Sequence, residues 1–182
     1  MFSLVFSRRY AMAHRLLADA SNVDGGDKCA TPHGHNETVT VTLRAINPIA
    51  LDGTRNMVER FETAKSTWHR WIDDQVDHAF QLGDSDPLLG FFREHEPERL
   101  PRLLITPGDP TTEVLACCFM AKLNAFLASE GSGLRCVQVS IEETPTNTVA
   151  FDGDPHAALG IAVSAGNWWC RADMSMNDLG SR

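Results

Sequence analysis

Two segments near the N-terminus alternate apolar and polar side chains with the period of a β-strand. In residues 2–14 one face of the predicted strand carries most of the apolar side chains, and the series ends at His14. From His33 to Leu43 the alternation returns, with valines on the side of His33 and His35 and threonines on the other side. Both segments are therefore predicted to be strands with one buried face.

Apolar residues at helical spacing predict two helices after these strands. The stripe of the first helix consists of Met57, Phe61, Ala64, Trp68, Trp71 and Ile72. The second helix is expected to open at Asp109, an N-cap residue that is followed by Pro110 at the first helical position. Residues 83–108 lie between the two helices and are rich in proline, glycine and charge, so we interpret them as a loop or excursion.

Residues 137–143 and 149–151 alternate again and predict a third and a fourth strand, joined as a hairpin. Glu143 continues the apolar face of the third strand and should therefore point inward. The element order is strand, strand, helix, helix, strand, strand. It predicts an α+β fold: a four-stranded antiparallel sheet with two helices on one face.

Composition limits the classes of partner. The formal net charge of −8 at pH 7 argues against a general nucleic-acid or membrane-surface binder, although it is compatible with an anionic small-molecule substrate. The short apolar stretch at the N-terminus precedes its arginines, which is the wrong order for a secretory signal. The five cysteines have no paired spacing. We therefore expect a cytoplasmic protein without a nucleic-acid or membrane partner.

Three histidines are candidate metal ligands. His33 and His35 flank Gly34, so a strand directs both rings to one face, and glycine leaves room for a close approach to the backbone. Together with His14 they would leave a fourth coordination position open, as in catalytic zinc sites. The alternative is three unrelated polar histidines at strand ends, and the same-face pair favours the metal.

Further residues with chemical potential allow two interpretations each. Cys29 is either a fourth ligand, which would make the metal structural, or a thiolate beside the metal that acts as a base. Asp77 and His78 are either a solvated helix end or a minimal acid–base unit. An inward Glu143 needs a partner, which is an internal cation or the donor edge of a guanidine-like heterocycle.

Taken together, these residues resemble the 6-pyruvoyltetrahydropterin synthase and 6-carboxytetrahydropterin synthase (QueD-like) family. The matching motifs occur in the family's order: Ala13-His14-Arg15-Leu16, Cys29-x-x-x-His33-Gly34-His35-Asn36, Asp77-His78, Pro110-Thr111-Thr112-Glu113 and Glu143-Thr144. The resemblance implies the tunnelling fold (T-fold), in which ββααββ subunits form a β-barrel on association into trimers, with two trimers stacked as a hexamer and active sites at subunit interfaces. We accordingly expect a T-fold domain over residues 1–152, with the excursion at 83–108. Residues 153–182 are expected to be a C-terminal extension and not a separate domain.

The resemblance also implies roles for the metal-site residues. His14, His33 and His35 would bind zinc. Cys29 would be the catalytic thiolate, which resolves its two interpretations by resemblance alone.

For the remaining residues the resemblance implies proton transfer and substrate binding. Asp77 and His78 would form the proton-donating relay. Glu143 would anchor the amino-pyrimidine edge of a pterin, with Thr111 and Thr112 in the same pocket.

Three residues separate Cys29 from His33. This spacing resembles the bacterial carboxy-type enzymes and differs from the five residues of the animal pyruvoyl enzymes. The resemblance therefore favours conversion of 7,8-dihydroneopterin triphosphate to 6-carboxy-5,6,7,8-tetrahydropterin, with loss of acetaldehyde and triphosphate, in queuosine (7-deazaguanine) biosynthesis. The alternatives are a 6-pyruvoyltetrahydropterin synthase, which eliminates triphosphate only, and a non-catalytic, zinc-stabilised pterin-binding homologue.

Overall fold

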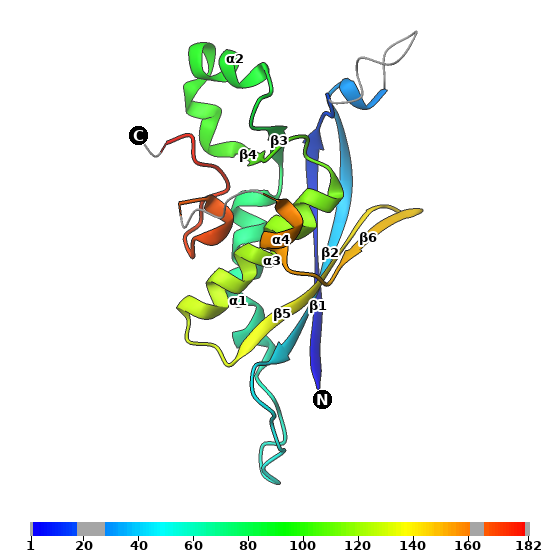
Figure 1. The fold of residues 1–182 in the computed structure, drawn as a ribbon, viewed down its shortest axis with the longest axis vertical. Coiled ribbons are helices and arrows are strands. Elements are labelled where there is room, and N and C mark those ends of the chain that lie inside the picture. Colours follow the sequence, from blue (N-terminus) through cyan, green and yellow to red (C-terminus); the bar gives the residue numbers. More distant parts are fainter. Residues whose placement is uncertain (1, 18–27, 161–165, 181–182) are drawn as a thin grey trace.

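The computed structural model describes residues 2–17, 28–160 and 166–180. Over these residues the chain forms a six-stranded sheet in the order β4-β3-β1-β2-β5-β6 (Figure 1). Four of the strands are those that the alternation predicts, and neighbours among them pair antiparallel: β1 (Ser3–His14), β2 (His33–Ala45), β5 (Leu134–Thr144) and β6 (Asn147–Phe151). The α+β class is therefore confirmed.

The sheet has two strands more than the four predicted. β3 (Ala79–Gly83) pairs parallel with β1 and with β4 (Leu103–Thr106). Residues 83–108 are thus more than a loop, because they also contain α2 (Leu88–His95) and a 3-10 turn over Pro97–Arg102. All four residues of β4 are buried, so the strand shows no alternation that a sequence pattern would reveal.

The two predicted helices are present and lie on one face of the sheet (Figure 1). α1 spans Phe61–Trp71 and α3 spans Thr112–Ser129. The N-cap of α3 is Thr111 and not Asp109, since the Thr111 hydroxyl accepts a hydrogen bond from the amide of Val114. The physical reason is that the backbone is still extended at Thr111, so the helix begins only at Thr112. The carbonyl of Pro110, which precedes Thr111, faces the ring of His14 in β1.

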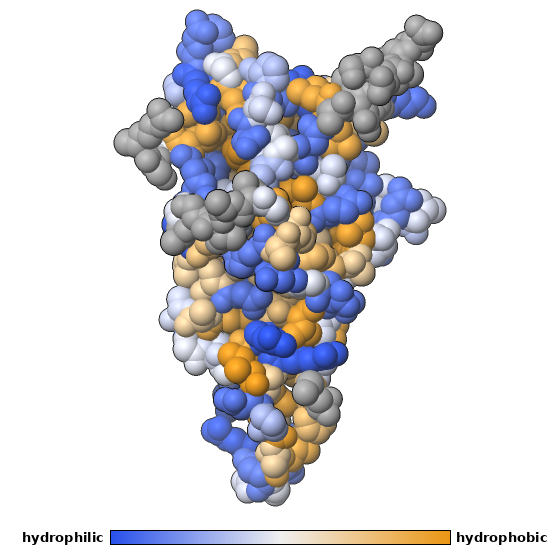
Figure 2. Space-filling model, in the orientation of Figure 1, coloured by the Kyte–Doolittle hydropathy of each residue, from blue (hydrophilic) through white to orange (hydrophobic). Residues whose placement is uncertain are grey.

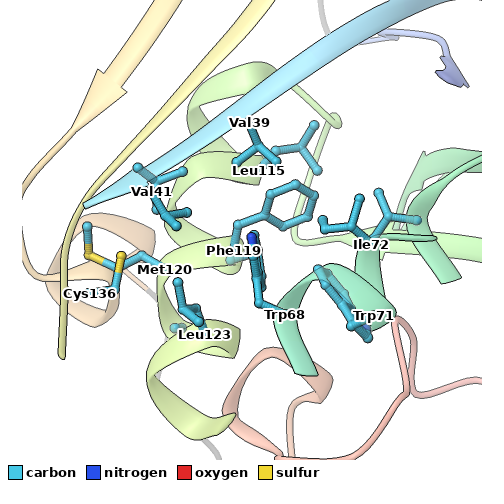
Figure 3. Packing of buried hydrophobic residues seen from close by; sticks show 14 of the residues in the cluster. Val39, Val41, Trp68, Trp71, Ile72, Leu115, Phe119, Met120, Leu123 and Cys136 are labelled. Carbon is cyan, nitrogen blue, oxygen red and sulfur yellow. The ribbon is translucent and has the colours of Figure 1, made fainter. Parts of the chain in front are cut away.

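The main core lies between these helices and the sheet. Figure 3 shows Trp68 and Trp71 of α1 around Phe119 of α3, with Val39 and Val41 of β2 above them. The ring centroids of Trp71 and Phe119 are 5.4 Å apart in an edge-to-face arrangement, which favours aromatic packing. α3 is long and apolar enough to cross a membrane by length and composition, but 67% of that stretch is buried inside the protein, as is typical of a core helix.

The C-terminal residues contribute to the same core. They include a short helix, α4 (Pro155–Leu159), and a 3-10 turn over Trp168–Cys170. The indole of Trp168 is buried and donates a hydrogen bond of 2.7 Å to the carbonyl of Ile105 in β4. The amide of Ile105 in turn donates to the carbonyl of Met176, so this tail covers the outer edge of β4. We therefore retain the proposal that residues 153–182 extend the domain.

The visible surface mixes polar and apolar residues, and apolar side chains gather at the end that carries the connection between β2 and α1 (Figure 2). Exposed apolar residues of this connection are Ile46, Ile49, Leu51 and Met57.

Candidate functional site

β1 and β2 bring the three predicted histidines together at one end of the sheet. His14 pairs with His33, and Met12 pairs with His35, so all three rings share the inward face. The Nε2 atoms of His14 and His33 are 3.1 Å apart, and the ring centroids of the trio lie 4.6 to 5.2 Å from one another. Each ring can offer one nitrogen, and these three nitrogens lie within 4.8 Å of one another, so the group could hold a metal ion.

The hydrogen bonds of two rings indicate which nitrogens are available to a metal. Nδ1 of His14 lies 3.1 Å from the carbonyl oxygen of Pro110, and Nδ1 of His33 lies 2.8 Å from that of Thr31. A carbonyl only accepts, so each Nδ1 carries the hydrogen and each neutral ring presents an Nε2 lone pair. Burial lowers the pKa of His14, which favours the neutral ring. Two lone pairs facing each other at 3.1 Å repel unless a proton or a metal ion lies between them, and the donor set therefore fits a metal.

Gly34 has a packing role between the two ligand histidines of β2. A Cβ atom built on this residue would lie 2.6 Å from the carbonyl oxygen of Met12. The close approach that the glycine permits is therefore that of β1 itself. This contact lets the strand ends approach closely enough to place the three rings around one point.

Cys29 lies in a short 3-10 turn over Lys28–Ala30. Its carbonyl accepts a hydrogen bond of 2.8 Å from the amide of Leu16, two residues after His14. The turn is thereby held beside the end of β1. The metal-binding group found in the described part of the chain consists of the three histidines and does not include Cys29.

Asp77 and His78 form a hydrogen-bonded pair beside β1. Oδ2 of Asp77 lies 2.9 Å from Nδ1 of His78, and Oδ1 accepts a hydrogen bond of 2.7 Å from the amide of Ala11. The bond from Ala11, followed by the contact with His78, lowers the pKa of Asp77. The imidazole of His78 is largely exposed, so an ionised carboxylate orients an accessible ring.

Glu143 of β5 borders a cavity of about 480 Å³. Its Oε1 accepts a hydrogen bond of 3.1 Å from the hydroxyl of Thr112, at the start of α3. Thr111 and Leu16 also line this cavity, and Leu16 connects it to the strand end that carries His14. Burial lowers the pKa of His14, and the charge of Glu143 opposes a small part of this lowering, so the cavity adjoins the histidine group.

Two buried polar residues next to this site are absent from the sequence-based predictions. Glu37 lies on the inward face of β2 between His35 and Val39, and burial raises its pKa to about 7, with a contribution from the charge of Glu143. Gln81 of β3 is fully buried and pairs in register with His14. The sequence alone could have predicted that Glu37 points inward, because in a strand residue 37 lies on the same face as His35 and Val39. For Gln81 no such prediction was possible, because β3 itself was not predicted.

Comparisons with known proteins identify the family of this chain. The family model of 6-pyruvoyl tetrahydropterin synthase matches residues 3–154. A probable 6-carboxy-5,6,7,8-tetrahydropterin synthase of Halobacterium salinarum is 32% identical over 140 residues, which cover 77% of this chain and 79% of that protein.

Solved structures show the same architecture. The 6-pyruvoyl tetrahydropterin synthase of Caenorhabditis elegans matches with a TM-score of 0.56 and 26% identity, over 84% of this chain and 96% of that one. An uncharacterized protein of Wolinella succinogenes matches in fold with a TM-score of 0.66 and 18% identity, over 84% of this chain and 98% of that one. The T-fold expectation is confirmed by these similarities. The protein is a lyase-type enzyme, and the chain belongs to the 6-pyruvoyl tetrahydropterin synthase family.

Proposed function

We propose that the protein is a zinc-dependent 6-carboxy-5,6,7,8-tetrahydropterin synthase. It would convert 7,8-dihydroneopterin triphosphate to 6-carboxy-5,6,7,8-tetrahydropterin, with loss of acetaldehyde and triphosphate, in queuosine biosynthesis. The observation that carries the proposal is the three-histidine group beside a cavity that ends at Glu143. The name of the Halobacterium salinarum relative supports the carboxy-type product.

His14, His33 and His35 would hold the zinc ion, since each presents a nitrogen to the same point. Bound there, zinc supplies a Lewis acid for the hydroxyl groups of the substrate side chain. The carbonyls of Pro110 and Thr31 keep two of the rings in the tautomer that binds metal.

Glu143 would anchor the substrate ring. The hydroxyl of Thr112 donates to Oε1 and thereby orients the carboxylate, which leaves Oε2 for the amino and ring N–H donors of a pterin. Thr111 lines the same cavity. Fixing the ring in this way places the side chain to be cleaved near the histidine group and lowers the entropic cost of reaction.

Proton transfer would involve two groups on opposite sides of β1. Cys29, held beside the end of the strand by Leu16, would remove a carbon-bound proton as a thiolate. His78, oriented by Asp77, would return a proton at another position. This transfer moves unsaturation from the ring to the side chain. Triphosphate is then eliminated, and addition of one water molecule from solvent balances the carbon–carbon cleavage that releases acetaldehyde.

The remaining expectations belong to the same proposal. Subunits would associate into a barrel-forming trimer, or a hexamer of two trimers, with the active sites at subunit interfaces. The enzyme would act in the cytoplasm on a small pterin triphosphate, without a nucleic-acid or membrane partner.

The decisive experiment is product identification together with metal analysis on purified protein. Zinc-loaded enzyme supplied with 7,8-dihydroneopterin triphosphate should release acetaldehyde and triphosphate in equal amounts. Triphosphate without acetaldehyde would instead identify a 6-pyruvoyltetrahydropterin synthase. Pterin binding without any turnover would identify a zinc-stabilised binding protein.

A further inference from the structure

The last residue of the turn over Pro97–Arg102 contacts the backbone that precedes His78. The guanidinium of Arg102 donates a hydrogen bond of 2.6 Å to the carbonyl of Asp77 and another of 2.8 Å to the carbonyl of Asp74. A planar guanidinium suits such a double contact, because its donors have a fixed relative geometry. Arg102 therefore connects residues 83–108, which the resemblance does not explain, to the acid–base pair.

The backbone at His78 depends on such support. His78 has a φ of 63°, in the left-handed region that residues other than glycine rarely adopt. Its amide donates to the carbonyl of Ala11 (2.8 Å), and the Asp77 carboxylate accepts from the amide of Ala11 (2.7 Å). β1 thus holds the pair from one side, and Arg102 holds the carbonyl between the two residues from the other. An unfavourable backbone conformation persists only where neighbouring contacts determine it.

The C-terminal tail holds the segment that carries Arg102. The side-chain amide of Asn177 donates to the carbonyl of Leu100 (2.9 Å) and to the carbonyl of Leu103 (2.7 Å). These two carbonyls flank Arg102 on both sides. A second contact, between Arg15 and Asp86, ties the start of the excursion to the residue that follows His14.

We propose that Arg102 is a positioning residue for the Asp77–His78 pair, and that Asn177 holds Arg102 in place. Residues 83–108 and the C-terminal tail would together support the backbone on the side of the Asp77–His78 pair that faces away from β1. The effect on turnover rests on the proposed function, whereas the effect on the backbone does not. The simpler alternative is that Arg102 only satisfies carbonyls at the end of the helical segment Ile72–Val76 and adds general stability.

The test compares Arg102→Gln with Arg99→Gln in the full-length, zinc-loaded protein. Arg99 lies in the same turn, but its side chain is 65% exposed, so it is a matched control. Amide hydrogen exchange of Asp77 and His78 should be at least tenfold faster in Arg102→Gln, with amides of β2 and α3 unchanged. Arg99→Gln should match the wild type, and Asn177→Ala should shift the same two amides by a smaller factor.

Kinetics provide the second measurement. The two hydrogen bonds of the Arg102 guanidinium go to the carbonyls of Asp74 and Asp77, and Arg102 belongs neither to the cavity lining nor to the histidine group. Arg102→Gln should therefore lower kcat at least tenfold while KM and zinc content change less than twofold. Arg102→Lys should recover part of kcat, because an ammonium also donates to carbonyls.

Three results would overturn the inference: unchanged exchange at residues 77 and 78, faster exchange throughout the protein, or faster local exchange with wild-type kcat. If the wild-type protein has no synthase activity, the proposed function fails, and the exchange measurement still decides whether Arg102 positions the pair.

Discussion

Lys122 donates a hydrogen bond of 2.9 Å to the carbonyl of Trp168 from a position with no solvent exposure. Its ammonium also lies 3.2 Å from the carboxylate of Asp173 and over the rings of Trp71 and Phe126. A lysine on the core helix α3 thus joins the C-terminal tail to the core. Burial is the main cause that lowers the pKa of Lys122, to about 8.

The lowered pKa predicts the pH dependence of stability. The folded protein holds this proton less tightly than the unfolded chain, whose lysine has a pKa of 10.5. The contribution of Lys122 to the free energy of unfolding should therefore rise between about pH 8 and pH 10.5, by up to roughly 3 kcal/mol. Tyr10, Cys118 and Cys136 act in the opposite direction over this range, because burial raises their pKa values. The contribution of Lys122 is therefore measured as a difference: by urea unfolding, the wild type and Lys65→Met should gain stability relative to Lys122→Met as the pH rises. A difference that does not change with pH would contradict the assignment.

Glu37 predicts that the free energy of unfolding falls as the pH rises, over a lower pH range than that of Lys122. Its folded-state pKa of about 7 exceeds the ordinary 4.5, so the folded protein binds this proton more tightly than the unfolded chain. The contribution to stability is complete below about pH 4.5 and is lost as the pH rises to about 7, a change of roughly 3 kcal/mol. Glu37→Gln should remove this part of the pH dependence in urea unfolding, whereas Glu142→Gln, at an exposed position, should retain it. Equal curves for Glu37→Gln and wild type would show that Glu37 titrates normally.

The histidine group predicts metal-dependent stability. Removing zinc with a chelator should lower Tm, since a ligand at 100 times its Kd stabilises the folded state by about 2.7 kcal/mol. His35→Ala should reduce bound zinc from one ion per chain to less than about 0.1 after dialysis, because two imidazoles remain. His95→Ala, at an exposed position of α2, is the control and should bind zinc normally. Normal zinc content in His35→Ala would place the metal elsewhere.

Cys29→Ala separates the two roles of the cysteine. As a catalytic base, Cys29 should contribute about 10²–10⁴-fold to kcat, and its replacement should leave zinc content and Tm unchanged. Cys170→Ala, far along the chain in the tail, is a control for thiol loss. A fall in zinc affinity and Tm together would make Cys29 a fourth ligand and the metal structural.

Glu143→Gln tests the anchor. The amide keeps a hydrogen bond to Thr112 but loses the charge that binds the donor edge of the ring. A hydrogen bond to a charged group contributes about 1.5–3 kcal/mol, so KM should rise roughly 10–100-fold with zinc content unchanged. The exposed neighbour variant Glu142→Gln should have wild-type kinetics. An unchanged KM in Glu143→Gln would exclude this carboxylate as the anchor.

Local patterns were sufficient for the elements that bury one face. The parity of β1 and β2 placed His14, His33 and His35 on the inward side, and the structure brings these rings together. Local patterns failed where context decides. The start of α3 shifted from Asp109 to Thr111, and Trp168 of the tail became a core residue without any periodic signal around it.

The sequence by itself determined the strands with one buried face, the two core helices and the order of the chemical motifs, because side-chain periodicity and motif spacing are local properties. Only the tertiary structure decided that β3 and β4 extend the sheet and that Glu143 lies close enough to Glu37 to contribute to its raised pKa. It also decided that Arg102 donates to the carbonyl of Asp77 and that Asn177 donates to the carbonyls of Leu100 and Leu103. These relationships join residues far apart in the chain, and they depend on register, burial and backbone conformation, which no local pattern encodes.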